Sequence, residues 1–144
     1  VETTPDKLGE TIFAAIEDWG NGKIVFPSSP EVEEYKLKEL FEQDAANNGG
    51  TRTYFQWDPA KGREECISNT ANADIGITFP YCGIAETATV VQASGEESGR
   101  AISLLPETHI HTRIHTCLRI KTAGLWWRMV QVQFLALPNT NHMA

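Results

Sequence analysis

The sequence predicts an α+β fold in which N-terminal helices pack against one side of a strongly curved antiparallel sheet. Three observations lead to this prediction. Apolar side chains recur at helical spacing only before Gly50, the later segments are rich in β-branched and aromatic residues, and the helical segments precede the strands. Helices and strands that are segregated along the chain are typical of α+β domains. The length of 144 residues fits one domain covering positions 1–144.

The first helix is predicted to begin near Pro5. Thr4 is a good N-cap, proline suits the first helical position, and Asp6 favours the positive end of the helix dipole. An apolar stripe then follows at helical spacing, made of Leu8, Ile12, Ile16 and Trp19. The turn residues at 20–22 end the helix.

A second helix is predicted from the same signals. Ser29 is the cap, Pro30 is the first helical residue, and three glutamates follow in the first turns. Its apolar side consists of Val32, Leu37, Leu40, Phe41 and Ala45. The run Asn-Asn-Gly-Gly at 47–50 predicts the end of this helix.

The rest of the chain predicts strands, apart from the segment 63–83, which has no clear periodicity. The predicted strands cover 51–57, 87–93, 100–105, 108–121 and 125–137. The last two are expected to form a hairpin across the short loop at 122–124, which ends in glycine.

Charge and composition limit the partners of the chain. The net charge of −7 opposes contact with phosphate backbones, so nucleic acid is not expected as a partner. No apolar run approaches the roughly 20 residues of a membrane span, and the N-terminus lacks a signal pattern. We therefore expect a cytoplasmic protein without membrane contact. The three cysteines do not suggest a disulfide framework, although a bridge between Cys66 and Cys82 stays open.

The predicted strand 108–121 carries the most reactive side chains. Side chains alternate between the two faces of a strand, so one face is apolar or Thr-bearing. The other face holds His109, His111, Arg113, His115, Cys117, Arg119 and Lys121. A solvated face is the simplest interpretation, because antiparallel sheets commonly have one wet side. Three of the four histidines lie here, however, which favours a functional face.

Three functional interpretations of this face stay open. A zinc site would use His109 and His111 with His115 or Cys117, although Arg113 would oppose the metal. A pocket wall would use the histidines for proton transfer and the arginines to hold an anionic or oxygen-rich ligand. In that pocket Asp74 or Glu86 would orient a histidine, and Tyr54 would face the cavity. An interface would add Trp126, Trp127 and Met129 of the neighbouring strand.

The stretch from His111 to Val130 resembles the closing strands of the NTF2-like (cystatin-like cone) superfamily. The likeness lies in a charged strand that runs into Gly124-Leu125-Trp126 and then into a final strand. Scytalone dehydratase and the SnoaL-type polyketide cyclases are similar in this part. The resemblance implies a cone-shaped pocket lined by His109, His111 and His115, frequent dimers and no obligatory cofactor.

These observations together predict a small-molecule-binding protein of the cone fold, possessing the chemistry of a cofactor-free lyase, isomerase or cyclase. The acid/base residues would be His109, His111 and His115. The substrate would contact Arg113, Arg119, Trp127 and Tyr54. A non-catalytic dimerisation or ligand-binding module is the first alternative, and a zinc site on His109, His111 and His115, or with Cys117, is the second. The expected partners are a small organic ligand and a second copy of the chain, as a homodimer.

Overall fold

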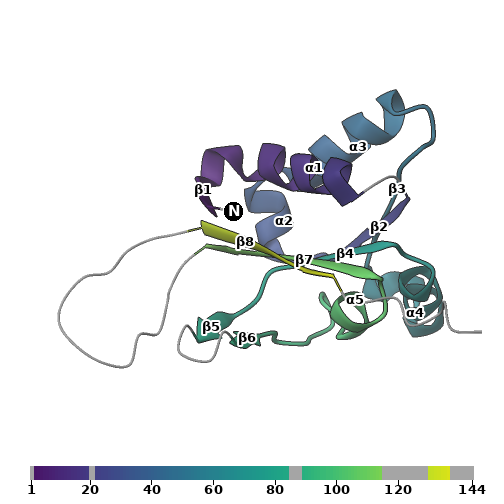
Figure 1. Ribbon diagram of the computed structural model, residues 1–144. Coiled ribbons are helices and arrows are strands. Elements are labelled where there is room, and N and C mark those ends of the chain that lie inside the picture. The colour runs from purple at the N-terminus through teal and green to yellow at the C-terminus, as the bar shows by residue number, and fades with distance from the viewer. Residues whose placement is uncertain (1, 20–21, 85–88, 115–129, 137–144) are drawn as a thin grey trace, which may run out of the picture.

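The computed structural model describes residues 2–19, 22–84, 89–114 and 130–136 (Figure 1). The centre of the described part is a six-stranded sheet with the order β1-β8-β7-β4-β2-β3. Its strands are β1 (Glu2–Thr3), β2 (Lys23–Phe26), β3 (Thr53–Gln56), β4 (Ile75–Thr78), β7 (Thr108–Ile114) and β8 (Val130–Ala136). A separate antiparallel pair is formed by β5 (Cys82–Ile84) and β6 (Thr89–Val91).

Helices cover both faces of this sheet (Figure 1). The upper face in the figure carries α1 (Leu8–Trp19), α2 (Pro30–Glu34) and α3 (Leu37–Asn47). The lower face carries α4 (Arg63–Ala71) and α5 (Ala101–Leu104). Short 3-10 helices lie at Pro5–Lys7 and Pro59–Lys61. Among the described helices, none has the length and apolar character that crossing a bilayer requires.

The predicted α+β cone with an antiparallel sheet is wrong, because the four strands β3, β2, β4 and β7 are mutually parallel. Two helices that the sequence analysis missed explain the difference. Helix α4 lies in the segment without clear periodicity, and α5 replaces the strand expected at 100–105. Each helix lies in a connection that carries the chain back along the sheet, so the next strand enters in the same direction as the last. The antiparallel pairing of β7 with β8 is confirmed.

Two apolar layers hold the helices on the sheet. On the upper face, Ile24, Ile75, Ile77 and Ile110 pack against α1 to α3 in one continuous cluster. On the lower face, a smaller cluster joins Val25 to Cys66 of α4 and Ile102 of α5, together with Trp57. Side chains alternate along β2 and thus reach both layers. Cys66 and Cys82 are both free thiols.

Lys36 divides the predicted second helix into α2 and α3. Its backbone has φ 51° and ψ 34°, in the left-handed region. A side chain with a Cβ is strained there, which makes this conformation unfavourable for lysine. The break still allows Val32 of α2 and Phe41 of α3 to be fully buried on the same layer.

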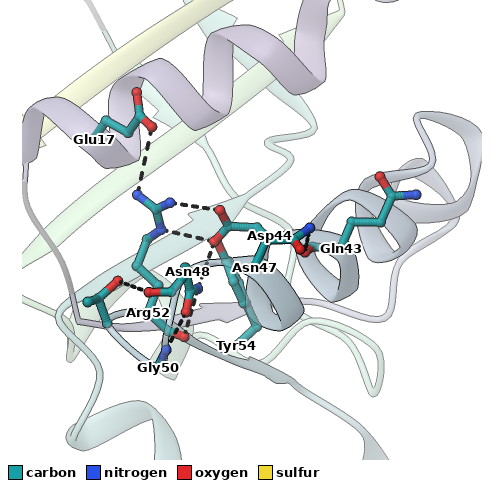
Figure 2. A network of polar contacts seen from close by, with 9 residues as sticks. Glu17, Gln43, Asp44, Asn47, Asn48, Gly50, Arg52 and Tyr54 are labelled. Carbon is teal, nitrogen blue, oxygen red and sulfur yellow. Dashed lines mark hydrogen bonds and ion pairs between the residues drawn. The ribbon is translucent and has the colours of Figure 1, made fainter.

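A polar network joins α3 to β3 (Figure 2). Arg52 donates to both carboxylate oxygens of Asp44, from Nη2 at 2.7 Å and from Nε at 2.9 Å. The Tyr54 hydroxyl donates to the same carboxylate at 2.6 Å, and the Tyr54 ring stacks on Phe41. These donors, above all Arg52, lower the pKa of Asp44 to about 2. Burial and the nearby Asp44 carboxylate raise the pKa of the Tyr54 hydroxyl, so it stays protonated.

We expect Lys36→Gly to stabilise the protein by about 1 kcal/mol, because glycine relieves left-handed strain of this order. Thermal unfolding followed by circular dichroism measures the change. The matched control is Lys38→Gly, which places glycine in the first turn of α3 and should lower stability by up to about 1 kcal/mol. Equal destabilisation by both variants would show that Lys36 is not strained.

We expect Asp44→Asn to lower the free energy of unfolding by about 1.5–3 kcal/mol near pH 7, since this is the net contribution of hydrogen bonds to charged groups. The depressed pKa of Asp44 means that its ionised form stabilises the fold above about pH 4, the ordinary range of an unfolded aspartate. This contribution is lost as the pH falls toward 2, so the free energies of unfolding of the variant and the wild type should become similar there. Urea unfolding at several pH values tests this. Glu42→Gln, an exposed carboxylate on the same helix, is the control and should change little.

Candidate functional site

The carboxyl ends of β2 and β4 mark the place where the winding of the sheet changes direction. From β2 the chain crosses the upper face by α2 and α3 to reach β3. It then returns by α4 across the lower face to β4, on the other side of β2. In open α/β sheets, ligands bind outside the carboxyl ends of the strands at this switch point. The polar side chains at this edge therefore make up the candidate site.

Two serines follow β2 at this edge. The Ser28 N–H donates to the carbonyl of Glu97 at 3.0 Å, and the Ser28 hydroxyl donates to the same carbonyl at 3.3 Å. The Ser29 hydroxyl oxygen is buried, and it has no hydrogen-bond partner among the described residues. A buried hydroxyl without a partner is uncommon and calls for an explanation such as a missing water or ligand.

The loop 94–99, which precedes α5, lies against this edge. The indole N–H of Trp57, just after β3, donates to the Glu96 carbonyl at 3.0 Å. Gly99 lies so close to the Trp57 ring that a Cβ at this position would collide with it. The loop is thus fixed to the ends of both β2 and β3, through Ser28 and Trp57.

A threonine and two histidines lie on the lower face of β4 and β7. Thr78 ends β4 and is fully buried, and His111 stands beside it in the parallel register and is 5% exposed. The Thr78 hydroxyl oxygen and His109 Nε2 are 2.7 Å apart and share a hydrogen bond whose direction depends on the imidazole tautomer. The rings of His109 and His111 have centroids 5.6 Å apart.

His109 is neutral at physiological pH. Burial, and secondarily the neighbouring His111, lower its pKa to about 4. A neutral imidazole that shares one nitrogen with Thr78 can donate or accept a hydrogen bond without carrying charge. The arrangement therefore supplies neutral polar groups at the carboxyl edge.

The structure brings together only part of the predicted site. His109 and His111 lie side by side, whereas Tyr54 is on the upper face and belongs to the Asp44 network. Asp74 lies at the opposite edge, where its carboxylate accepts the Lys23 N–H at 2.6 Å. Of the remaining predictions, the side chain of Arg113 and the residues Glu86, His115, Cys117, Arg119, Trp126, Trp127 and Met129 lie outside the described residues.

The sequence analysis missed Thr78, Ser29 and Trp57 as members of this edge. A signal was present at Thr78, because Ile75-Gly76-Ile77 is a short apolar run that ends shortly before Pro80. Such a run is consistent with a strand buried on both faces, and the residue at its carboxyl end is then a site candidate. No comparable sequence signal marked Ser29, which was predicted only as a helix cap.

The fold and this edge define a class: a three-layer α/β protein with a doubly wound parallel sheet and a candidate ligand site at its carboxyl edge. The family model that matches the chain is the LUD domain, over residues 3–112. The chain belongs to the LUD domain family. The predicted NTF2-like or SnoaL-type membership is therefore wrong.

The curated relatives are bacterial proteins named lactate utilization protein C. Those of Bacillus subtilis and Bacillus licheniformis are 36% identical over 110 residues, which are 76% of this chain and 45% of each relative. The protein of Geobacillus sp. (strain WCH70) is 37% identical over 110 residues, or 44% of its length. The chain thus spans less than half the length of these relatives. No solved structure is significantly similar to it.

This membership overturns the expected function. The relatives are named for lactate utilization, not as cone-fold lyases, isomerases or cyclases, nor as dimerisation modules. The alternative of a zinc site on His109, His111 and His115, or with Cys117, is overturned on the same ground. His115 and Cys117 lie outside the described residues, and within those residues no group of three His, Cys, Asp or Glu side chains is placed to hold a metal.

We expect Gly76→Ala to destabilise the protein by about 1–3 kcal/mol, the usual cost of overpacking. A Cβ at Gly76 would collide with the backbone carbonyl of Ile102, which cannot move without shifting α5. Urea unfolding measures the loss, and the imidazole NMR signals of His109, on the same face of the next strand, should shift with it. The control Gly95→Ala adds a methyl group that meets nothing within 4 Å and should be nearly neutral. Equal stability of the two variants would refute the close packing of α5 on β4.

Proposed function

We propose that this chain acts in lactate utilization and that its carboxyl edge binds a small 2-hydroxy- or 2-oxo-carboxylate. The single observation that carries the proposal is the Thr78–His109 pair at the switch point of a chain whose relatives are named for lactate utilization. Each relative is about twice as long as the matched segment, so the activity of the whole protein belongs to this proposal as well.

The chemistry of the edge supports a small oxygen-rich ligand. The hydroxyls of Ser29 and Thr78 and the neutral imidazole of His109 provide hydrogen-bonding groups close to the switch point. Such groups fix the orientation of hydroxyl, carbonyl and carboxylate oxygens in small-molecule sites. No cofactor is part of this proposal, and the expected homodimer stays a prediction.

A chimera tests the pathway. In the Bacillus subtilis relative, the 110 matched residues are replaced by those of this chain, in a strain that lacks its own copy. We expect growth with lactate as the sole carbon source. Thr78→Val in the chimera should abolish this growth, while Thr53→Val, at an exposed position of β3, should not. The proposal is rejected if the chimera accumulates normally and the strain grows with glucose but not with lactate as the sole carbon source.

Calorimetric titration of the purified chain with lactate and with pyruvate tests the site directly. Thr78→Val should weaken binding tenfold or more, because it removes the hydroxyl that holds His109. The affinity should be constant between about pH 5.5 and 8, since the pKa of His109 is about 4 and the imidazole stays neutral throughout. A steep change of affinity near pH 6.5 would show that a charged histidine binds the ligand instead.

A further inference from the structure

A groove lies on the upper face, between α1 and the segment that joins α2 to α3. It has a volume of about 440 Å³. Most of its lining comes from one side of α1. Gly9, Phe13 and Glu17 follow one another at intervals of four residues and therefore lie on the same side of the helix. The opposite wall is formed by Tyr35, at the junction of α2 and α3, and by Leu40 of α3. The groove is separated by the whole sheet from His109 and Thr78.

The floor of the groove is apolar. Phe13 is half-buried, and its ring contacts Phe41 of the core at 5.7 Å between centroids. Gly9 is buried at a point where a Cβ would collide with Leu40, so α1 and α3 approach closely below the groove. An apolar floor of this kind accepts apolar side chains from a partner, as grooves that bind amphipathic helices do.

The rim of the groove is acidic. Asp6, Glu10 and Glu17 line it with exposed carboxylates, and no lysine or arginine is among the lining residues in the described part of the chain. Arg52 Nη1 lies 3.9 Å from Glu17 Oε1, which is a long ion pair (Figure 2). The Glu17 side chain is 65% exposed. Residues 1–107 contain all 19 acidic residues of the protein but only eight of its 12 lysines and arginines, so this part of the chain is acidic as a whole.

We propose that this groove docks an amphipathic helix of a partner protein, with apolar side chains on the floor and lysine or arginine side chains on the rim. Charge complementarity carries the choice of partner, because three carboxylates follow the α1 wall beside an apolar floor. Glu10 and Glu17 are seven residues apart, or about 10.5 Å along α1. A partner helix that lies along α1 presents basic residues at the same spacing when they are also seven residues apart. This inference is independent of the carboxylate site proposed above.

The test uses the complete chain and a fluorescently labelled model helix. The probe is a Leu/Lys peptide of roughly 18 residues, with leucines at helical spacing and lysines elsewhere. Fluorescence anisotropy gives its affinity for the wild type, for Ala14→Lys and for Ala71→Lys. Ala14 is an exposed lining residue of the groove, and Ala71 is an exposed residue at the end of α4 on the other face. Both substitutions add the same charge without removing a buried side chain.

We expect Ala14→Lys to weaken binding tenfold or more and Ala71→Lys to change it less than twofold. Glu10→Gln should weaken binding severalfold, and raising the salt concentration should weaken wild-type binding, because charge attraction is screened. Circular dichroism of each variant confirms that it is folded. The proposal is overturned if the wild type does not bind the probe, if the two lysine variants bind equally well, or if a peptide of the same composition in scrambled order binds as tightly.

Discussion

Burial of the central strands on both faces is the constraint from which the rest of this structure follows. All four residues of β4 are buried, as are Ile24, Val25 and Phe26 of β2. Parallel strands with this degree of burial require cover on each side, and here the cover comes from helices that also make the crossovers. Since parallel strands share their direction, their carboxyl ends meet at one edge. The same constraint therefore places Ser29 and Thr78 in one region of the molecule.

The two layers around the sheet have different compositions. The upper layer is a continuous cluster of large apolar side chains that includes Leu8, Ile12 and Phe41. The lower layer is smaller, and next to its apolar cluster it buries the polar side chains of Thr78 and His111. Polar groups in a protein interior are costly unless they are hydrogen-bonded, and the Thr78 hydroxyl meets this requirement through its contact with His109. The layer that holds the candidate ligand site is thus also the less apolar one.

Sequence reasoning succeeded where a single element, or two strands joined by a short loop, carried a local pattern. The apolar stripe of α1 and the pairing of β7 with β8 were predicted, and so was the presence of His109 and His111 on one face. It failed where the pattern depends on the tertiary structure. Helix α4 buries only Cys66 and Thr70, too few side chains to give a helical period, and β4 has no alternation because both of its faces are buried. Without α4 and α5, the parallel sheet and its switch point could not be predicted.

The last strand has a consequence for the edge of the parallel part of the sheet. The family model matches residues 3–112, whereas β8 covers Val130–Ala136 and pairs with β7 along its whole length. Without that neighbour, β7 would expose the backbone N–H and C=O groups of one side over seven residues. An uncovered strand of this kind is a template for edge-to-edge association between chains. In this chain, residues beyond the matched segment therefore cover this side of β7.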